Sequence, residues 1–439
     1  MSERILGITA EYDPFHNGHR YHLNCAREAA RPEGVVCVMS GDFTQRGEPA
    51  IADKWRRARI ALHQGVDLVL ELPFLCACNR ADRFAAGAVD ILAGAGVSHI
   101  AFGCETEHPE RLAELARLQL SCGSRWEARI REEMKGGLSR AKAAQIAGDA
   151  LFGEDLNRLS LEPNNILALE YLKRIRFWEE RGRRIEAVPI LRYGAGHKEA
   201  DVRCDPADGH PFAVSMVAGT AGSEPRVAGD SAPGVDSCFA GGSVLRRMLC
   251  CGEDIRPFVP GETAETLNWL DQESARREML RQLQGIVLRS TPEELENIYC
   301  VGEGLENRLH REIREAESYD GLLDRMTSKR YTASAIRRIL TYILMGLPGG
   351  RADAILSGRS DGPTGTRYGR LLAANEAGRR ILGSAPSMPV IANINRTQNL
   401  PSLIRDSLSL DIRAADLYHL LRGESITEND DRRKQPWVE

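Results

Sequence analysis

Short apolar runs alternate with longer amphipathic segments through the first half of the chain. The runs contain few polar positions, which is typical of strands buried on both faces of a parallel sheet. The predicted strands are Ile5–Ala10, Gly34–Met39, Asp67–Leu72, His99–Gly103 and Ala187–Arg192. Segments between them, such as Lys54–Gln64 and Ala81–Ala93, carry apolar residues at helical spacing. Together these elements predict an α/β fold with a parallel sheet, in which ligands bind beyond the carboxyl ends of the strands.

The second half of the chain has a different pattern. From Glu262 onward strand signals are sparse and helical periodicity dominates. The predicted helices are Arg276–Val287, Pro292–Tyr299, Leu305–Ala316, Tyr319–Thr327 and Ala333–Met345. We therefore predict an α/β domain over residues 1–260 and a mostly α-helical domain over residues 261–439. Residues 204–242 lack periodicity and predict a flexible surface loop, with a plain linker favoured over a functional lid. The charged residues 428–439 predict a frayed tail.

Composition and charge describe a globular protein, because 42% of the 439 residues are hydrophobic and 27% are charged. The formal net charge is −4, so any nucleic-acid surface must be a local basic patch. The 11 cysteines form no pair of C-x-x-C motifs, which argues against a zinc knuckle. No apolar run reaches the ~18 residues of a membrane span and no signal-peptide pattern is present, so we expect a cytoplasmic protein without membrane contact.

The most informative motif lies where the first predicted strand ends. The segment Glu11–His19 reads EYDPFHNGH, so a turn leads into His-x-Gly-His and a predicted helix from Arg20. Backbone N–H groups and the positive end of the helix dipole converge at such a junction, which suits a phosphate. His16 and His19 can each donate a hydrogen bond to an oxyanion, and Gly18 leaves room for a phosphate beside the backbone. An ordinary turn and a partial metal site are the alternatives, but the position after the first strand favours phosphate chemistry.

Other candidate ligand-binding residues lie at strand ends and helix starts. Ser243 and Arg246 begin a predicted helix, where they either bind the β- and γ-phosphates or form an N-cap and a surface arginine. Arg192 ends a strand, so it either reaches a phosphate or snorkels at the sheet edge. Asn164 and Asn165 either cap the following helix or bind a ribose or an adenine.

Two further positions carry weaker signals. Gly103 follows a buried strand, which is explained most simply by a nucleotide lying against the backbone. Lys54 begins a predicted helix near the second strand end, so it either neutralises a phosphate or a carboxylate or lies in solvent.

A compact basic cluster with one aromatic residue lies in the predicted helical domain. Its members are Lys329, Arg330, Tyr331, Arg337 and Arg338. Basic charge next to an aromatic ring is typical of surfaces that bind RNA phosphates and stack a base. A solvated surface is the alternative, and RNA contact is favoured here.

These motifs resemble the bacterial tRNA(Met) cytidine acetate ligases, relatives of the His-x-Gly-His nucleotidyltransferases. The resemblance extends over nearly the whole chain and rests on Glu11–His22, Ser40–Ala50, Asp67–Pro73, Phe102–Glu105, Pro163–Leu167 and Lys329–Thr332. It implies a Rossmann-like nucleotidyltransferase domain followed by a helical tRNA-binding domain. It also implies that ATP activates acetate as acetyl-adenylate and that the acetyl group passes to the wobble cytidine of elongator tRNA(Met), giving N4-acetylcytidine.

The resemblance also implies roles for individual residues. The family's ATP-binding segment matches Thr9, Ala10, Glu11, Tyr12, Asp13, Pro14, Phe15, His16, Asn17, Gly18, His19, Arg20, Tyr21 and His22. Further nucleotide contacts match Gly103, one of Asn164 and Asn165, and Arg192. The family's Ser-Ala-Thr-x-x-Arg pattern is replaced here by Gly241–Arg246, which leaves open the phosphate contact of the first serine.

The expected mechanism assigns His16 and His19 to the α-phosphate transition state, and Arg192 and Arg246 to the leaving pyrophosphate. Mg²⁺ is expected to accompany ATP, although the sequence shows no dedicated carboxylate cage and predicts no protein-bound metal. The expected partners are ATP, acetate and elongator tRNA(Met), with no stable protein partner. Two alternatives stay open: a small-molecule adenylyltransferase of cofactor metabolism, which leaves the helical half without a purpose, and a non-catalytic RNA-binding protein.

Overall fold

A single mixed sheet forms the centre of the computed structural model, which describes residues 3–192, 238–266, 269–357, 368–384, 386–428 and 430–439. Five parallel strands follow the order β5-β4-β1-β2-β3. Their bounds are β1 (Ile5–Ala10), β2 (Gly34–Ser40), β3 (Leu68–Leu72), β4 (His99–Cys104) and β5 (Glu186–Leu191). The prediction of an α/β fold with a parallel sheet is confirmed, and each predicted strand is present with ends shifted by no more than a residue.

Three strands from the end of the chain extend this sheet. They are β6 (Gly369–Ala374), β7 (Val390–Ile391) and β8 (Trp437–Val438). Strand β6 pairs with β3 in antiparallel orientation, and β7 and β8 pair with β6. The sequence did not predict these strands, so the chain beyond residue 261 is not helical throughout. The division into domains at residue 260 stays a prediction.

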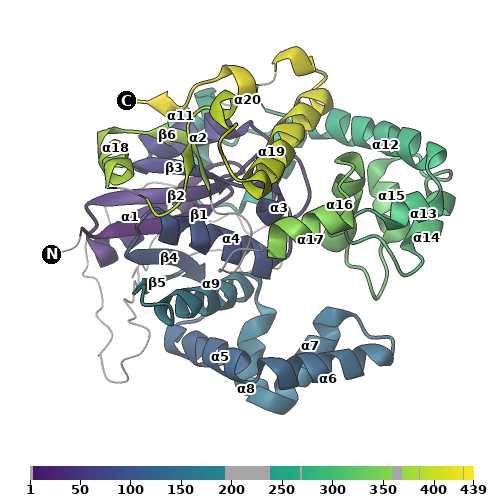
Figure 1. The fold of residues 1–439 in the computed structure, drawn as a ribbon, viewed down its shortest axis with the longest axis horizontal. Coiled ribbons are helices and arrows are strands. Elements are labelled where there is room, and N and C mark those ends of the chain that lie inside the picture. Colours follow the sequence, from purple (N-terminus) through teal and green to yellow (C-terminus); the bar gives the residue numbers. More distant parts are fainter. Residues whose placement is uncertain (1–2, 193–237, 267–268, 358–367, 385, 429) are drawn as a thin grey trace.

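Helices account for most of the remaining chain (Figure 1). Those within the first 180 residues are α1 (Asn17–Ala30), α2 (Lys54–His63), α3 (Phe74–Ala77), α4 (Ala81–Gly94), α5 (Pro109–Ser121), α6 (Gly123–Lys135), α7 (Arg140–Phe152), α8 (Glu154–Asn157) and α9 (Pro163–Glu179). Those that follow are α10 (Gly242–Cys250), α11 (Gly261–Thr266), α12 (Gln272–Arg289), α13 (Pro292–Glu296), α14 (Leu305–Glu312), α15 (Tyr319–Met326), α16 (Ala333–Leu344), α17 (Gly349–Ser357), α18 (Glu376–Gly383), α19 (Ser402–Leu421) and α20 (Asp430–Arg433).

The strands are apolar throughout because helices cover both faces of the sheet. Along β2, Val36 and Val38 face a core shared with α4, α9 and α18, whereas Val35 and Cys37 face a core shared with α1 and α2. Side chains that alternate between two buried faces explain why the strands show runs of apolar residues rather than an alternating pattern.

A second core joins the helical region to the sheet. Helices α12 and α14 to α17 pack together with α19, and Figure 1 shows this group beside the sheet. The loop after β2 and helix α3 also contribute to this core, through Phe43 and Phe74 respectively. The carboxyl ends of the parallel strands therefore face the helical region, and a ligand at that edge lies close to both parts of the chain.

The end of the chain is anchored rather than frayed, which corrects the expectation for residues 428–439. Asp431 is buried, β8 pairs with β6, and Arg59 lies over the Trp437 ring at 4.1 Å. Of the predicted flexible loop 204–242, residues 204–237 lie outside the described residues. Among the described helices none is both long and apolar enough to cross a membrane.

Candidate active site

The turn between β1 and α1 holds the two motif histidines in a fixed arrangement. His16 caps α1, and its Nδ1 accepts a hydrogen bond from the Gly18 backbone N–H at 3.1 Å. The His16 backbone N–H donates in turn to Nδ1 of His19 at 3.3 Å. The two imidazole rings stack with their centroids 3.7 Å apart. Because both Nδ1 atoms act as acceptors, the proton of each neutral ring resides on Nε2.

Burial keeps these imidazoles neutral. It lowers the pKa of His16 to about 3 and that of His22 to about 4, with the positive charge of Arg192 acting in the same direction. It also lowers the pKa of His19 well below its ordinary value. At neutral pH the stacked pair therefore presents N–H donors without carrying charge, which suits stabilisation of charge that develops on a phosphate.

Gly18 also has a structural reason within the turn itself. A Cβ atom at this position would lie 2.9 Å from Cε1 of His16. A side chain would therefore displace the ring that caps the helix. Room for the His16 ring therefore gives a reason for the glycine, and the predicted room for a phosphate stays a prediction.

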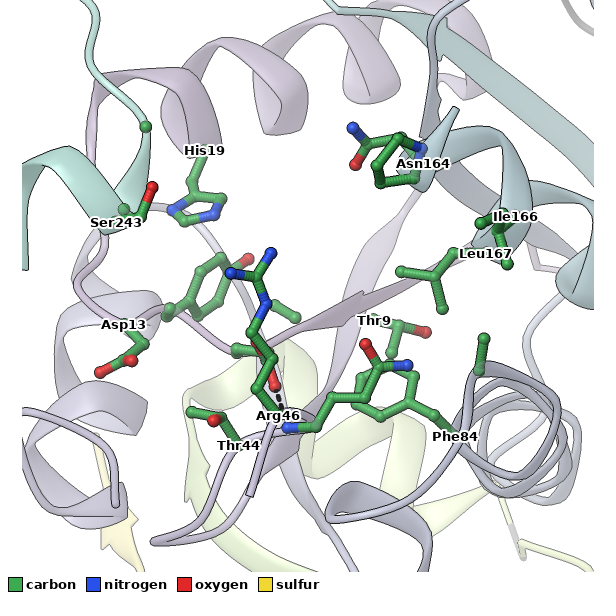
Figure 2. Close-up of a pocket in the computed structure, with 18 of the residues that line it drawn as sticks. Thr9, Asp13, His19, Thr44, Arg46, Phe84, Asn164, Ile166, Leu167 and Ser243 are labelled. Carbon is green, nitrogen blue, oxygen red and sulfur yellow. Dashed lines mark hydrogen bonds between the residues drawn. The ribbon is translucent and has the colours of Figure 1, made fainter. Parts of the chain in front are cut away.

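A cavity of about 840 Å³ opens beside this turn (Figure 2). Its lining includes these predicted nucleotide-binding residues: Thr9, Ala10, Glu11, Tyr12, Asp13, His16, His19, His22, Asn164, Arg192, Ser243 and Arg246. Other predicted residues do not line it: Pro14, Phe15, Asn17, Gly18, Arg20, Tyr21, Gly103 and Asn165. Phe15 packs in the core, and Asn17 donates to the backbone oxygens of Cys238 and Pro257, both at 3.0 Å. These two residues shape the turn instead of contacting the cavity.

The two neighbouring asparagines have different surroundings. Asn164 lines the cavity, and its Nδ2 donates to the Glu105 carboxylate. Asn165 is buried, and its Oδ1 accepts from the Glu105 backbone N–H at 2.8 Å. Gly103 lies beneath Arg192, because a Cβ there would meet the Arg192 Cγ at 3.3 Å. The geometry thus favours Asn164 and Arg192 as ligand contacts, whereas Asn165 and Gly103 support them.

Helix α10 closes the opposite side of the cavity. Arg246 donates to the Asp13 backbone oxygen at 2.6 Å and pairs with the Asp13 carboxylate at 3.2 Å. Ser243 is exposed in the first turn of α10, and Figure 2 places it near His19. The N-terminus of a nine-residue helix therefore lies beside the stacked histidines, and its dipole favours an anion there.

The predicted RNA-binding cluster divides into two groups. Arg330 and Tyr331 both contact Glu303, at 2.6 Å and 3.1 Å, while Lys329 is exposed. Arg337 and Arg338 instead contact the loop after β2: Arg337 pairs with Glu48 at 3.4 Å, and Arg338 lines the cavity. Arg338 thus brings the helical region into the wall of the site.

Lys54 is buried and contacts neither solvent nor the cavity. Its Nζ lies 2.7 Å from Oε1 of Glu71 and 2.8 Å from Oδ2 of Asp431. Of the roles considered from the sequence, neutralising carboxylates is the one that the structure supports.

Several residues that line the cavity were not predicted from the sequence. They are Thr44, Gln45, Arg46, Arg80, Phe84 and Tyr171. The sequence did place residues 40–43 at the carboxyl end of the second strand. Because ligands bind at that edge of a parallel sheet, the loop that follows could have been considered a part of the site. In the described ranges no three His, Cys, Asp or Glu side chains gather as a metal site.

Comparison with known proteins identifies the family. A family model for HIGH Nucleotidyl Transferase matches residues 3–207 and 230–434. The tRNA(Met) cytidine acetate ligase of Syntrophotalea carbinolica is 33% identical over 435 residues, covering 95% of this chain and 94% of the relative. The chain belongs to the tRNA(Met) cytidine acetate ligase family. Another member, from Alkaliphilus metalliredigens, is 32% identical and covers 95% of this chain and 94% of its own.

Solved structures of this family share the fold. The crystal structure of apo Thermotoga maritima TmcAL has a TM-score of 0.82 and 28% identity, with 99% of both chains covered. The same protein bound with alpha-thio ATP gives a TM-score of 0.80 and 27% identity, again over 99% of both chains. The family resemblance predicted from the sequence is confirmed.

Proposed function

We infer that this chain is an ATP-dependent tRNA(Met) cytidine acetate ligase that forms N4-acetylcytidine. One observation carries the inference: a stacked pair of neutral histidines at a helix N-terminus faces a cavity that both the sheet and the helical region line. The relatives are named tRNA(Met) cytidine acetate ligases, which supports a cytidine of tRNA(Met) as the acetyl acceptor. The relative bound with alpha-thio ATP supports ATP as the activating substrate.

In the first proposed step, an oxygen of acetate attacks the α-phosphorus of ATP. The new bond joins carbon-bound oxygen to phosphorus, and the bond between the α-phosphorus and the bridging oxygen breaks as pyrophosphate leaves. His16 and His19 donate from Nε2 to the α-phosphate oxygens, where negative charge grows in the transition state. Ser243, Arg246 and the N-terminus of α10 hold the pyrophosphate, and Asn164 and Arg192 contact the adenosine and the phosphates.

In the second step, the exocyclic amine of the wobble cytidine attacks the acetyl carbon and AMP leaves. The base must leave its stack to reach the cavity, because unstacked loop bases are the ones that protein pockets read. Lys329, Arg330, Tyr331, Arg337 and Arg338 are proposed to bind the tRNA. Arg338 is placed to act nearest the chemistry because it lines the cavity.

Mg²⁺ is proposed to enter with ATP. Asp13 is the carboxylate nearest the stacked histidines in sequence, and both its oxygens are engaged, with the Ile51 backbone N–H at 2.7 Å and with Arg246 at 3.2 Å. The protein therefore offers water and phosphate contacts rather than a carboxylate cage, as is common for this ion. We propose a cytoplasmic location with no stable protein partner, where ATP, acetate and tRNA are available.

A small-molecule adenylyltransferase is the competing function. It would use the same first step but needs no helical region in the cavity wall, whereas Arg338 and Ser334 of α16 line the cavity here. The names of the relatives also favour the tRNA ligase.

Mass spectrometry of nucleosides tests the proposed function. Purified protein is incubated with ATP, ¹³C-labelled acetate and bulk tRNA, and labelled N4-acetylcytidine is expected. His19→Ala should reduce its formation about 10²- to 10³-fold, since it removes one donor to the developing charge. Arg117→Ala, an exposed change on α5, serves as the matched control and should leave the rate unchanged. Adenylation of a small molecule without any tRNA product would favour the competing function.

A further inference from the structure

One side of the cavity has no role in the first of the two steps described above. The strand order β5-β4-β1-β2-β3 places neighbours on both sides of β1, so the cavity has a β4 side and a β2 side. Three lining residues contact β4 or the residue after it: His22 at Phe102, Arg192 at Cys104 and Asn164 at Glu105. They define the β4 side, where the proposed function places the nucleotide. The β2 side is lined by the loop after β2 and the start of α4, through Thr44, Gln45, Arg46, Arg80 and Phe84. Acetate must approach the α-phosphate from a side that the nucleotide leaves open.

Arg46 is the cation on the β2 side that is available for a ligand. Arg80 pairs with Asp82 at 2.9 Å, and Arg338 donates to the Gln45 backbone oxygen at 3.4 Å. Arg46 forms no hydrogen bond or ion pair with any residue in the described part of the chain. Figure 2 shows its side chain extending from the loop into the cavity.

The loop that carries Arg46 is held by contacts with the turn after β1 and with the helical region. The Gln45 backbone N–H donates to Oε1 of Glu11 at 2.7 Å. From the helical region, the Thr341 hydroxyl donates to the Gly47 backbone oxygen at 2.7 Å. Burial raises the pKa of Glu11, and the charge of Arg46 opposes this effect, so the two side chains influence each other without an ion pair. Such bracing holds Arg46 in position before a substrate arrives.

We propose that Arg46 binds the carboxylate of acetate and positions it for attack on the α-phosphate. This inference rests on the proposed function. One carboxylate oxygen accepts from the guanidinium, and the other forms the bond to phosphorus while pyrophosphate takes the electron pair of the broken bond. Arg46 keeps its protons throughout. A guanidinium suits this task because its planar N–H groups match the oxygens of a carboxylate, and its charge offsets that of acetate as acetate approaches the α-phosphate.

The acetate dependence of ATP–pyrophosphate exchange tests this role. Arg46→Ala should raise the KM for acetate about 10- to 100-fold, the range expected for losing a hydrogen bond to a charged group. Its Kd for ATP should stay within about twofold of wild type, which also shows that the variant is folded. Arg46→Lys retains the charge but not the planar donors, so its KM should lie between those of Arg46→Ala and wild type. Arg117→Ala is again the matched control.

Preformed acetyl-adenylate shows whether Arg46 binds acetate or RNA. This compound bypasses the first step, so Arg46→Ala should acetylate tRNA from it at a rate within about threefold of wild type. An unchanged KM for acetate would overturn the proposal. A raised KM for tRNA with acetyl-adenylate would also overturn it, because Arg46 would then be an RNA contact. Failure of the wild-type protein to form N4-acetylcytidine at all would instead contradict the proposed function.

Discussion

Lys54 gives the sharpest prediction about what holds the site together. It is 1% exposed, and its Nζ lies within 4 Å of three carboxylates: Glu71 at 2.7 Å, Asp431 at 2.8 Å and Asp42 at 3.6 Å. Arg370 shares two of them, at 2.6 Å from Asp431 and 3.3 Å from Glu71. Burial alone would lower the pKa of Lys54, but Asp431 and Glu71 outweigh it and raise that pKa, so the ammonium is charged.

Lys54→Met should destabilise the protein by about 3–5 kcal/mol at pH 7.5, because removing one partner of a buried ion pair leaves the other charges uncompensated. The loss should shrink toward pH 5. Without Lys54 the pKa of Glu71 in the folded protein rises further above its value in the unfolded chain. The free energy of unfolding of the variant is therefore reduced most at a pH where the unfolded carboxylates are ionised, and least where they are protonated.

Urea unfolding followed by circular dichroism measures this loss. Lys135→Met, which changes an exposed lysine at the end of α6, is the control and should cost under about 1 kcal/mol. The double variant Lys54→Met/Asp431→Asn should lose less than the sum of the two single losses, since the residues interact directly. A loss below about 1 kcal/mol for Lys54→Met, independent of pH, would refute the reasoning.

Two further predictions concern the imidazoles and the asparagines. In NMR titrations of the free protein, His16 and His22 should stay neutral down to pH 5, whereas His63, whose hydrogen bonds to two carboxylates outweigh its burial and raise its pKa, should titrate above 6.5. The buried histidines bind protons near pH 6.5 in the unfolded chain but not in the folded protein, so they should make stability fall as the pH drops below that value. A titration midpoint near 6.5 for His16 would contradict this. Asn164→Ala should raise the KM for ATP with little change in stability, whereas Asn165→Ala should cost about 1–3 kcal/mol of stability by leaving the part-buried Glu105 N–H without its acceptor. Kinetics and urea unfolding of both variants check this, and the reverse pattern would show that the assignment is wrong.

The first five strands and the corner after β1 could be predicted because their signals are local. An apolar run buried on both faces needs no knowledge of its partners, and the spacing of His16 and His19 sets their contacts within a single helical turn. Residues 369–374 read GRLLAA, which has no β-branched residue and predicts no strand. This segment is a strand because β3 offers it an edge, and tertiary pairing overrides its weak propensity.

Residues that act through long-range contacts could not be predicted. The charged tail gave no sign that Asp431 would meet Lys54, which lies 377 positions earlier. The position of Arg46 likewise depends on Thr341 and on Glu11, which come from distant parts of the chain. Single-sequence patterns report local periodicity, so the pairing of such residues appears only in the folded chain.

Isotope transfer from acetate tests most directly whether the corner after β1 activates a carboxylate on ATP. The protein is supplied with ATP, tRNA and acetate carrying ¹⁸O in both oxygens, and the AMP product is analysed by mass spectrometry. Attack of acetate on the α-phosphorus predicts one ¹⁸O atom in each AMP, because acetyl transfer breaks the carbon–oxygen bond and leaves that oxygen on phosphorus. AMP without the label, or a labelled inorganic phosphate together with ADP, would contradict the account.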